Sequence, residues 1–152
     1  MIKIKISTRG RYGLEAVLDL AIHVSDGPVN LKSISERQGL SDKYLEQLFI
    51  ALKRNKIVES RRGAQGGYIL SRDAGEITVK EVLDVLEGPL APVDCIVENK
   101  ENHCDQFQGC VTKVVWKKLM DELNSIADSI TIAELVVCFR NTNKEKEIEY
   151  YI

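Results

Sequence analysis

The sequence predicts a mainly α-helical fold with a small β-hairpin wing: a winged helix-turn-helix followed by a long C-terminal dimerisation helix. Two short amphipathic segments separated by Gly39 lie within residues 30–54, which is the arrangement of a helix-turn-helix. A glycine-rich turn between two short apolar runs follows at residues 56–70, as in a hairpin wing. An apolar stripe at helical spacing then extends from Cys110 to Ser129.

The first three helices are predicted from apolar spacing and capping residues. Residues 13–24 place apolar side chains at helical spacing, and Gly27-Pro28 ends this helix. Asn30 is an N-cap for a short second helix that ends at Gly39, and Ser41 is an N-cap for the third. The wing then follows, with strands at residues 56–60 and 68–70.

The C-terminal half contains two further helix starts and one unusually long helix. Thr78–Glu81 and Thr131–Glu134 both match the capping box. The helix over residues 110–129 would be about 30 Å long, and a stripe of that length is best covered by a second copy of the chain. The charged, weakly patterned residues 141–152 are expected to form a mobile tail.

Charge is divided unequally along the 152 residues. Residues 1–72 carry a net charge of +6 and residues 73–152 a net charge of −8, although the whole chain is only −2. A basic N-terminal half favours a polyanion partner for that half alone. No apolar run approaches a membrane span, and the N-terminus does not resemble a secretory signal, so a cytoplasmic location without membrane attachment is expected.

These features predict double-stranded DNA as the partner. In a helix-turn-helix the second helix enters the major groove and its N-terminal residues meet base edges. The candidates for base contact are Ser41, Asp42, Lys43, Tyr44, Glu46 and Gln47. The wing candidates are Arg61, Arg62 and Gln65, whose turn can reach a narrow minor groove. The candidates for phosphate contact are Arg9, Arg11, Lys53, Arg54 and Lys56.

Two competing functions are disfavoured by the residues. A phosphate-binding loop should open a helix and carry Gly-Lys-Ser/Thr, whereas the glycine turn here leads into an apolar strand. An enzyme would need a nucleophile with its base, or an open metal site. The two histidines lie in no such pattern, so we expect the protein not to be an enzyme.

Four ordered segments resemble the Rrf-two superfamily of bacterial winged-helix repressors, and this resemblance covers residues 2–95 densely. The segments are Ser7–Leu14, Leu31–Ser41, Tyr44–Leu48 and Arg62–Tyr68. The resemblance implies a homodimeric repressor that binds a pseudo-palindromic operator. Compared with IscR-like members, Glu46 resembles the glutamate that tunes sequence preference. Tyr44 and Gln47 resemble base-reading residues, and Arg62 resembles a minor-groove arginine.

Cys95, Cys104 and Cys110 lie in one polar segment before the long helix. Three thiolates on one loop suit a thiophilic metal or an iron–sulfur cluster. IscR-like members hold a [2Fe–2S] cluster with three cysteines and a histidine three residues after the third, where this chain has Lys113. The residues alone leave [2Fe–2S] and [4Fe–4S] open. The candidates for a fourth ligand are His103, Asp94, Glu98, Asp105, or a group from the N-terminal helix or a second subunit.

Other uses of the cysteines remain open. A zinc site usually contains a short Cys-x2-4-Cys pair, which is absent from these three. A metal-free thiol switch is the second alternative. Cys138, within an apolar helix, is expected to be a core residue.

The predicted organisation has four parts. They are a winged helix-turn-helix domain (1–88), a cysteine-containing cluster-binding loop (89–110), dimerisation helices (111–140) and a tail (141–152). The predicted function is cluster-controlled repression of genes for iron–sulfur cluster biogenesis or related sulfur and redox processes. The segment around Glu87-Gly-Pro and the Tyr-Tyr-Ile end resemble CymR-like members. These features imply an alternative, a repressor of cysteine-metabolism genes controlled by a partner protein or by thiol oxidation.

Overall fold

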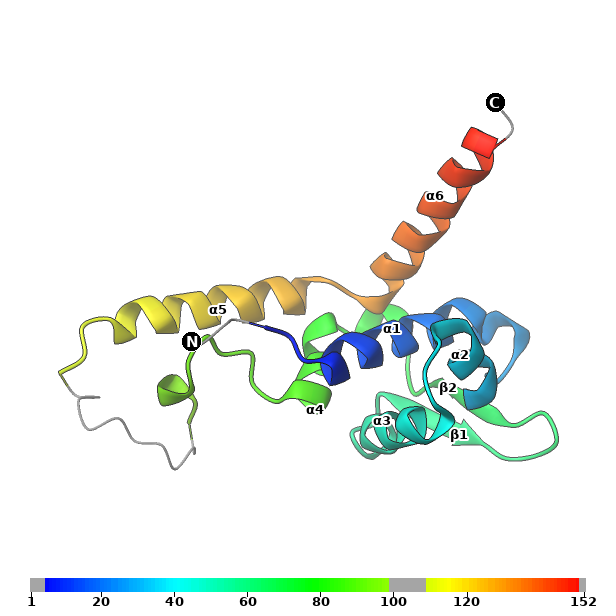
Figure 1. The fold of residues 1–152 in the computed structure, drawn as a ribbon, viewed down its shortest axis with the longest axis horizontal. Coiled ribbons are helices and arrows are strands. Elements are labelled where there is room, and N and C mark those ends of the chain that lie inside the picture. The colour runs from blue at the N-terminus through cyan, green and yellow to red at the C-terminus, as the bar shows by residue number, and fades with distance from the viewer. Residues whose placement is uncertain (1–4, 99–108, 151–152) are drawn as a thin grey trace.

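The computed structural model describes residues 5–98 and 109–150, which form six α-helices and one two-stranded antiparallel hairpin (Figure 1). The helices are α1 Thr8–His23, α2 Leu31–Gln38, α3 Asp42–Arg54, α4 Val79–Glu87, α5 Lys113–Ser129 and α6 Ile132–Tyr150. The strands are β1 Val58–Arg61 and β2 Gly67–Leu70, and short 3-10 turns lie at η1 Val24–Asp26, η2 Ala74–Glu76 and η3 Asp94–Ile96. The predicted winged-helix fold with a long C-terminal helix is confirmed.

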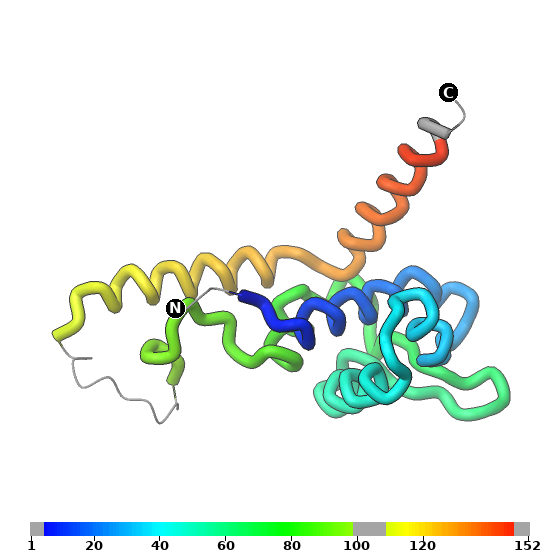
Figure 2. The backbone as a smooth tube through the Cα atoms, viewed as in Figure 1, coloured from blue at the N-terminus to red at the C-terminus, as the bar shows by residue number. Residues whose placement is uncertain are grey.

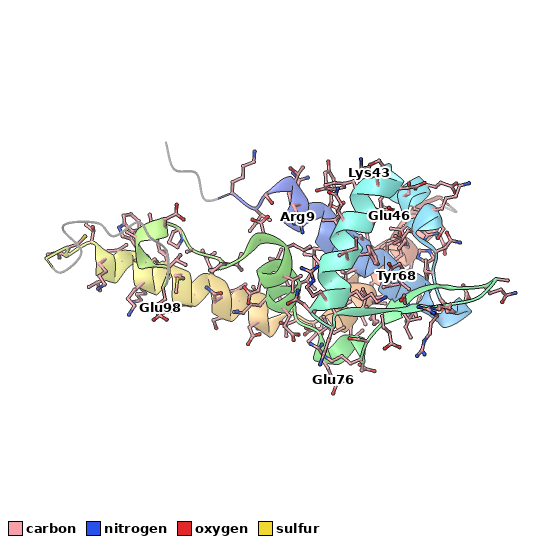
Figure 3. All side chains as sticks on the ribbon, turned by 90° about the horizontal axis from the view of Figure 1, so that it is seen from below. Arg9, Lys43, Glu46, Tyr68, Glu76 and Glu98 are labelled. Atoms are coloured by element: carbon pink, nitrogen blue, oxygen red, sulfur yellow. The ribbon has the colours of Figure 1, made fainter. Side chains whose placement is uncertain are left out.

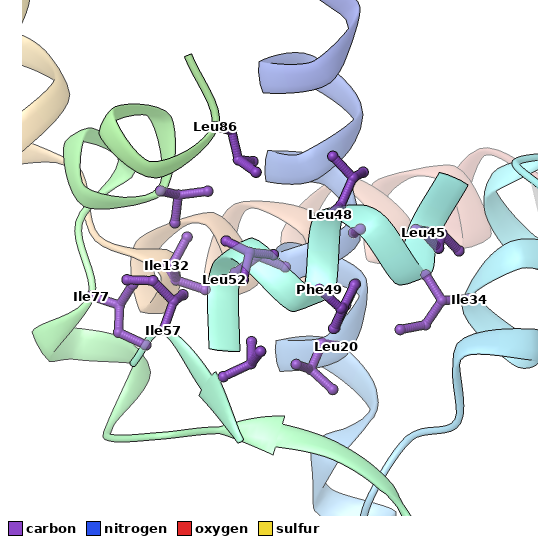
Figure 4. Close-up of a cluster of buried hydrophobic side chains, with 14 of the residues drawn as sticks. Leu20, Ile34, Leu45, Leu48, Phe49, Leu52, Ile57, Ile77, Leu86 and Ile132 are labelled. Carbon is purple, nitrogen blue, oxygen red and sulfur yellow. The ribbon is translucent and has the colours of Figure 1, made fainter. Parts of the chain in front are cut away.

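The head of the molecule, residues 5–87, is built around the apolar face of α3 (Figure 4). Its fully buried side chains are Leu45, Leu48, Phe49 and Leu52. They pack in one cluster with Leu20 of α1, Ile34 of α2, Ile77 and Ile132. Since Ile132 belongs to the first turn of α6, the C-terminal helix begins inside the core of the head.

The predicted capping residues begin the helices as expected. The side chains of Asn30, Ser41 and Thr78 each accept a hydrogen bond from a backbone N–H in the following turn. Thr131 and Glu134 also form the reciprocal capping-box hydrogen bonds. Hydrogen bonds from the Thr131 N–H, which has the larger effect, and from the Thr131 hydroxyl lower the pKa of the Glu134 carboxyl.

Helix α1 begins five residues earlier than the apolar pattern predicts. Ser7 is its N-cap, and the helix runs through Gly10 and Gly13, both of which are buried. A Cβ added at Gly13 would lie 2.0 Å from the Leu86 Cδ1 atom of α4. The two glycines therefore allow α1 and α4 to approach closely, an advantage that helix propensity alone does not reveal.

The path of the chain separates the cysteine segment from the head (Figure 2). After α4 the chain leaves the head to reach η3, and it returns along α5 to the start of α6. Backbone hydrogen bonds fix this return, from Val79 N to Ile130 O at 2.8 Å and from Ile132 N to Ile77 O at 2.9 Å. The N-terminal end of α4 is thereby connected to the junction between α5 and α6.

The C-terminal region differs from the sequence-based picture in two places, and the expectation for Cys138 is wrong. Residues 141–150 continue α6 as a helix, although they lack an apolar stripe, because Lys and Glu are good helix formers. Cys138 is exposed in the single chain and is not a core residue, because α6 projects away from the head beyond its first turns (Figure 1). Within the described ranges, no helix is long and apolar enough to cross a membrane.

Candidate DNA-binding surface and cysteine segment

The outer face of α3 is exposed and polar. Lys43, Glu46 and Gln47 are exposed, whereas the opposite face of the helix is buried in the core. Two hydrogen bonds stabilise the turn before α3. Gly39, which has φ +66°, donates its N–H to Ser35 O. The Ser35 hydroxyl donates to Leu40 O at 2.6 Å. Viewed from below, α3 crosses in front of α1, with Lys43 and Glu46 labelled along it (Figure 3).

Of the three remaining candidates at the start of α3, Asp42 is exposed, and Ser41 and Tyr44 have structural contacts of their own. The exposed Ser41 caps the helix by accepting from Tyr44 N at 3.2 Å. Tyr44 is half-buried, and its ring meets that of Tyr12 edge-on at 6.5 Å between centroids. The exposed Arg11 lies over the Tyr12 ring at 5.8 Å. Tyr44 and Arg11 therefore belong to one small surface formed jointly by α1 and α3.

The hairpin lies next to α3 and has a cationic turn. Arg61, Arg62 and Gln65 are all exposed. The Arg61 guanidinium pairs with Glu59 at 2.6 Å, and the Lys53 ammonium at the end of α3 donates to the Ser60 hydroxyl at 2.6 Å. The wing is thus connected to the helix whose outer face it extends.

A backbone bridge fixes the wing to the start of α2. Val29 N donates to Tyr68 O at 2.9 Å, and Tyr68 N donates to Val29 O at 2.7 Å. A Cβ added at Gly67 would lie 2.4 Å from Val29 O, so only glycine allows this approach. The Tyr68 ring packs against Phe49 of the core at 4.9 Å between centroids.

Arg9 occupies a different environment from the other cationic candidates. It is half-buried, and its Nε donates to Leu86 O at 3.2 Å. Nearby, the Glu87 Oε1 atom accepts from Ser7 N at 2.6 Å, from Gly10 N at 3.2 Å and from the Ser7 hydroxyl. A carboxylate at a helix N-terminus is favourable because it satisfies backbone donors and complements the helix dipole.

An ion pair between the buried Asp19 of α1 and the exposed Arg37 of α2 was not found by sequence reasoning. The Asp19 carboxylate is 5% exposed and accepts from Arg37 Nε at 3.0 and 3.1 Å and from Arg37 Nη2 at 2.6 Å. Gln38 Nε2 donates to the same carboxylate at 3.1 Å. The hydrogen bond with Asp19 raises the pKa of Arg37. The signal in the sequence was Asp19 on the apolar face of a predicted helix. Its partner Arg37 lies on the next helix, so the pairing could not be predicted from the local pattern.

Two of the three predicted cysteine ligands lie within the described residues. Cys95 is half-buried in η3, which packs against α5, and Cys110 is half-buried just before α5 begins. The hydrogen bond between Cys110 Sγ and Thr112 Oγ1, 3.2 Å long, lowers the pKa of the Cys110 thiol, with further help from the Lys113 backbone. Both thiols are thus associated with the N-terminal part of α5.

The other proposed ligands are less fully placed. Cys104, His103 and Asp105 lie outside the described residues, whereas Asp94 and Glu98 are exposed beside Cys95. Among residues 5–98 and 109–150, no group of three or more His, Cys, Asp or Glu side chains is arranged to hold a metal ion. Lys113 is the first residue of α5, so the long helix begins three residues later than predicted.

Comparison with known proteins gives the family. The family model described as "Rrf2: Iron-dependent Transcriptional regulator" matches residues 6–137. The chain belongs to the Rrf2 family. Among curated members, the HTH-type transcriptional regulator IscR of Xenorhabdus nematophila is 43% identical over 132 residues, which cover 87% of this chain and 79% of that protein.

Solved structures of this family also match. IscR of T. potens is 45% identical with a TM-score of 0.70, covering 87% of this chain and 85% of that one. CymR of B. subtilis, titled the global cysteine regulator, is 38% identical with a TM-score of 0.71, covering 88% and 96%. The predicted resemblance is confirmed, and the family supports a DNA-binding transcriptional regulator, a class of protein distinct from enzymes.

Proposed function

We propose that this chain is a homodimeric repressor. Its winged helix binds a pseudo-palindromic operator, and Cys95, Cys104 and Cys110 hold an iron–sulfur cluster that governs this binding. The observation that carries the proposal is the polar face of α3 beside the cationic turn of the wing. In a winged helix, these two elements are the ones that enter the grooves of DNA.

The roles of individual side chains in DNA binding follow from their chemistry. Gln47 can pair with adenine, and Glu46 can accept from cytosine. Arg62 and Gln65 on the exposed turn would reach the minor groove. Neutralisation of phosphates, which fixes the register of the head, would come from the exposed side chains of Arg11, Lys53, Arg54 and Lys56. We assign Arg9 a smaller share of this binding, since it also donates to Leu86 O.

The homodimer is supported by an exposed apolar surface at Val111 and along α5. Large hydrophobic side chains are exposed at Val111, Val114, Val115, Leu119 and Ile126. Each 100 Å² of apolar surface removed from water contributes about 2.5 kcal/mol. A second copy related by two-fold symmetry covers such a helix most simply, and it also places two recognition helices on one duplex.

The cysteine segment supports a thiolate-bound cluster. Cys95 and Cys110 are half-buried on η3 and at the start of α5, and the lowered pKa of Cys110 favours the thiolate that iron requires. Cys104 would be the third ligand. When bound, a cluster supplies iron–thiolate bonds that respond to oxygen, redox state and iron supply. The protonated amine of Lys113 is no ligand, so the fourth donor would be one of the carboxylates, His103 or a group from the second subunit.

A continuous series of contacts connects this segment to the DNA-binding head. Asn124 of α5 donates to Leu90 O at 3.0 Å, and Glu87 at the end of α4 accepts from the first turn of α1. Helix α4 in turn packs against α1 and α3. A cluster held by Cys95, Cys104 and Cys110 would therefore bias the placement of α3 relative to its dimer mate. The affinity for DNA can change only as far as the cluster favours one placement over another.

The test compares cysteine variants purified without oxygen. We expect the full chain to be coloured and to contain iron and sulfide, and Cys104→Ala to lose most of both. Cys138→Ala is the matched control, because its thiol is exposed on α6 away from the segment. A wild-type chain that is colourless, iron-free and resistant to reconstitution would refute the cluster. Operator binding by Cys104→Ala that equals that of the loaded wild type under every redox condition would refute the coupling.

One observation favours a second candidate function. The chain covers 96% of the B. subtilis CymR structure but 85% of the T. potens IscR structure. The alternative is a repressor of cysteine-metabolism genes that is controlled by a partner protein or by thiol oxidation. An iron-free protein whose operator affinity changes on mild thiol oxidation, or on addition of a partner protein, would favour this alternative.

A further inference from the structure

Ile50 is an apolar side chain that remains 56% exposed in the middle of α3. The other large hydrophobic side chains that are exposed within the described ranges all lie between Val111 and Phe139. Those residues belong to the α5 and α6 region that we assign to the dimer. Ile50 is therefore an isolated apolar group on the head.

The position of Ile50 on α3 is on the face proposed to meet DNA. Residues three, four and seven apart lie on one side of a helix. Ile50 follows Gln47 by three residues, Glu46 by four and Lys43 by seven. All three are exposed, whereas Leu48 and Leu52 of the opposite face are fully buried.

We propose that Ile50 contacts the 5-methyl group of a thymine in the operator and thereby contributes to sequence selectivity. This inference rests on the proposed DNA binding. The thymine methyl is the apolar group among the base-pair features of the major groove, and isoleucine has no donor or acceptor for a phosphate. Ile50 lies about 6 Å further along the helix axis than Glu46. That distance is close to two base-pair steps, so the two side chains would read different base pairs.

The experiment removes the methyl group from DNA and the apolar side chain from the protein. The probe is the duplex that the full chain, purified without oxygen, selects from a random-sequence pool. Each thymine in one half-site is replaced in turn by deoxyuridine, which pairs as thymine does and lacks only the 5-methyl group. Binding is measured by fluorescence anisotropy for the wild type and for Ile50→Ser, which alters an exposed position and should leave the fold intact.

We expect one thymine whose replacement weakens wild-type binding about fourfold, the effect of one buried methyl group. The same replacement should leave the affinity of Ile50→Ser unchanged. Ile50→Val, which keeps a branched apolar side chain, should retain most of the sensitivity. This pattern would assign the contact to Ile50 and not to a change in DNA shape.

Three outcomes overturn the inference. The first is that no thymine is sensitive, or that the sensitivity persists in Ile50→Ser. The second is that Ile50→Ser dissociates the dimer in the absence of DNA, which would make Ile50 a subunit contact. The third is that the chain selects no duplex, which overturns the proposed DNA binding as well. In the first two outcomes the proposed function stands.

Discussion

Replacing Gly13 by alanine tests the close approach of α1 and α4. Alanine is the better helix former by about 1 kcal/mol, so a prediction based on helix propensity would expect the variant to be more stable. The structure predicts the opposite. The new Cβ would lie 2.0 Å from Leu86 Cδ1 and 3.3 Å from Leu86 Cγ, and Leu86 is only 6% exposed.

The magnitude follows from two opposing effects. Forcing one extra carbon into a packed interface costs about 1–3 kcal/mol, and the gain in helix propensity offsets about 1 kcal/mol of that cost. We therefore expect Gly13→Ala to lower the free energy of unfolding by about 1 kcal/mol. The Leu86→Ala variant removes the obstructing atoms, so in that background the same substitution should raise the free energy of unfolding by about 1 kcal/mol.

The assay is urea unfolding of the metal-free chain at fixed protein concentration, monitored by circular dichroism. The four chains form a double-mutant cycle, in which the coupling free energy should be about 2 kcal/mol. Gly109→Ala is the control, because a Cβ there meets no atom within 4 Å and its φ is not positive. Removing a glycine at such a site should be neutral or slightly stabilising. If Gly13→Ala stabilises the chain equally in both backgrounds, the close approach of α1 and α4 is refuted.

Three further outcomes can be measured with single variants. Asp19→Asn should lower the free energy of unfolding by about 2 kcal/mol. This effect is smaller than that of breaking a fully buried ion pair, because the Arg37 side chain is 36% exposed. A loss below 0.5 kcal/mol in urea unfolding would contradict a stabilising role of the Asp19–Arg37 pair. Leu119→Asp should yield monomers in sedimentation, whereas Lys118→Asp should not; a persistent dimer would argue against the α5 interface. In the metal-free folded chain, Cys110 should reach half its maximal alkylation rate at a lower pH than in the urea-unfolded chain. The reason is that its lowered pKa allows the reactive thiolate to form at lower pH. The rate is read by peptide mass spectrometry, and identical pH profiles for the folded and unfolded chains would contradict the lowered pKa.

The helix starts and the wing could be predicted because their chemistry is local. Asn30, Ser41 and Thr78 cap helices through contacts within three residues of their own position. The hairpin likewise follows from a glycine-rich turn between two short apolar runs. Its strands pair from Val58 with Leu70 to Arg61 with Gly67, so β1 begins two residues later than predicted, and Arg61 and Gly67, predicted to lie in the turn, belong to the strands. Such signals need no knowledge of the rest of the fold.

Several of the features that were missed involve distant parts of the chain. Helix α1 begins at Thr8 because Ser7 caps it, and Glu87, about 80 residues later, accepts hydrogen bonds from Ser7 N and Gly10 N. Cys138 is exposed because α6 leaves the head, a direction that the local apolar pattern does not specify. The exposure of Ile50 is of the same kind, since only the packing of α3 shows which of its apolar side chains remains outside the core.

Charge separation explains how a chain with net charge −2 can bind a polyanion. Helix α3 and the hairpin, which carry exposed cations, lie on the lower side of the head in Figure 1, whereas α6 projects from the upper side. Helix α6 begins at Ile132, so Glu145 and Glu147 lie about 20 Å along it from the head, which is more than two Debye lengths at physiological ionic strength. The carboxylates near its end, Glu145 and Glu147, are thus screened from DNA bound to the head. The salt dependence of binding should accordingly report the phosphates contacted by the head and not the net charge of the chain.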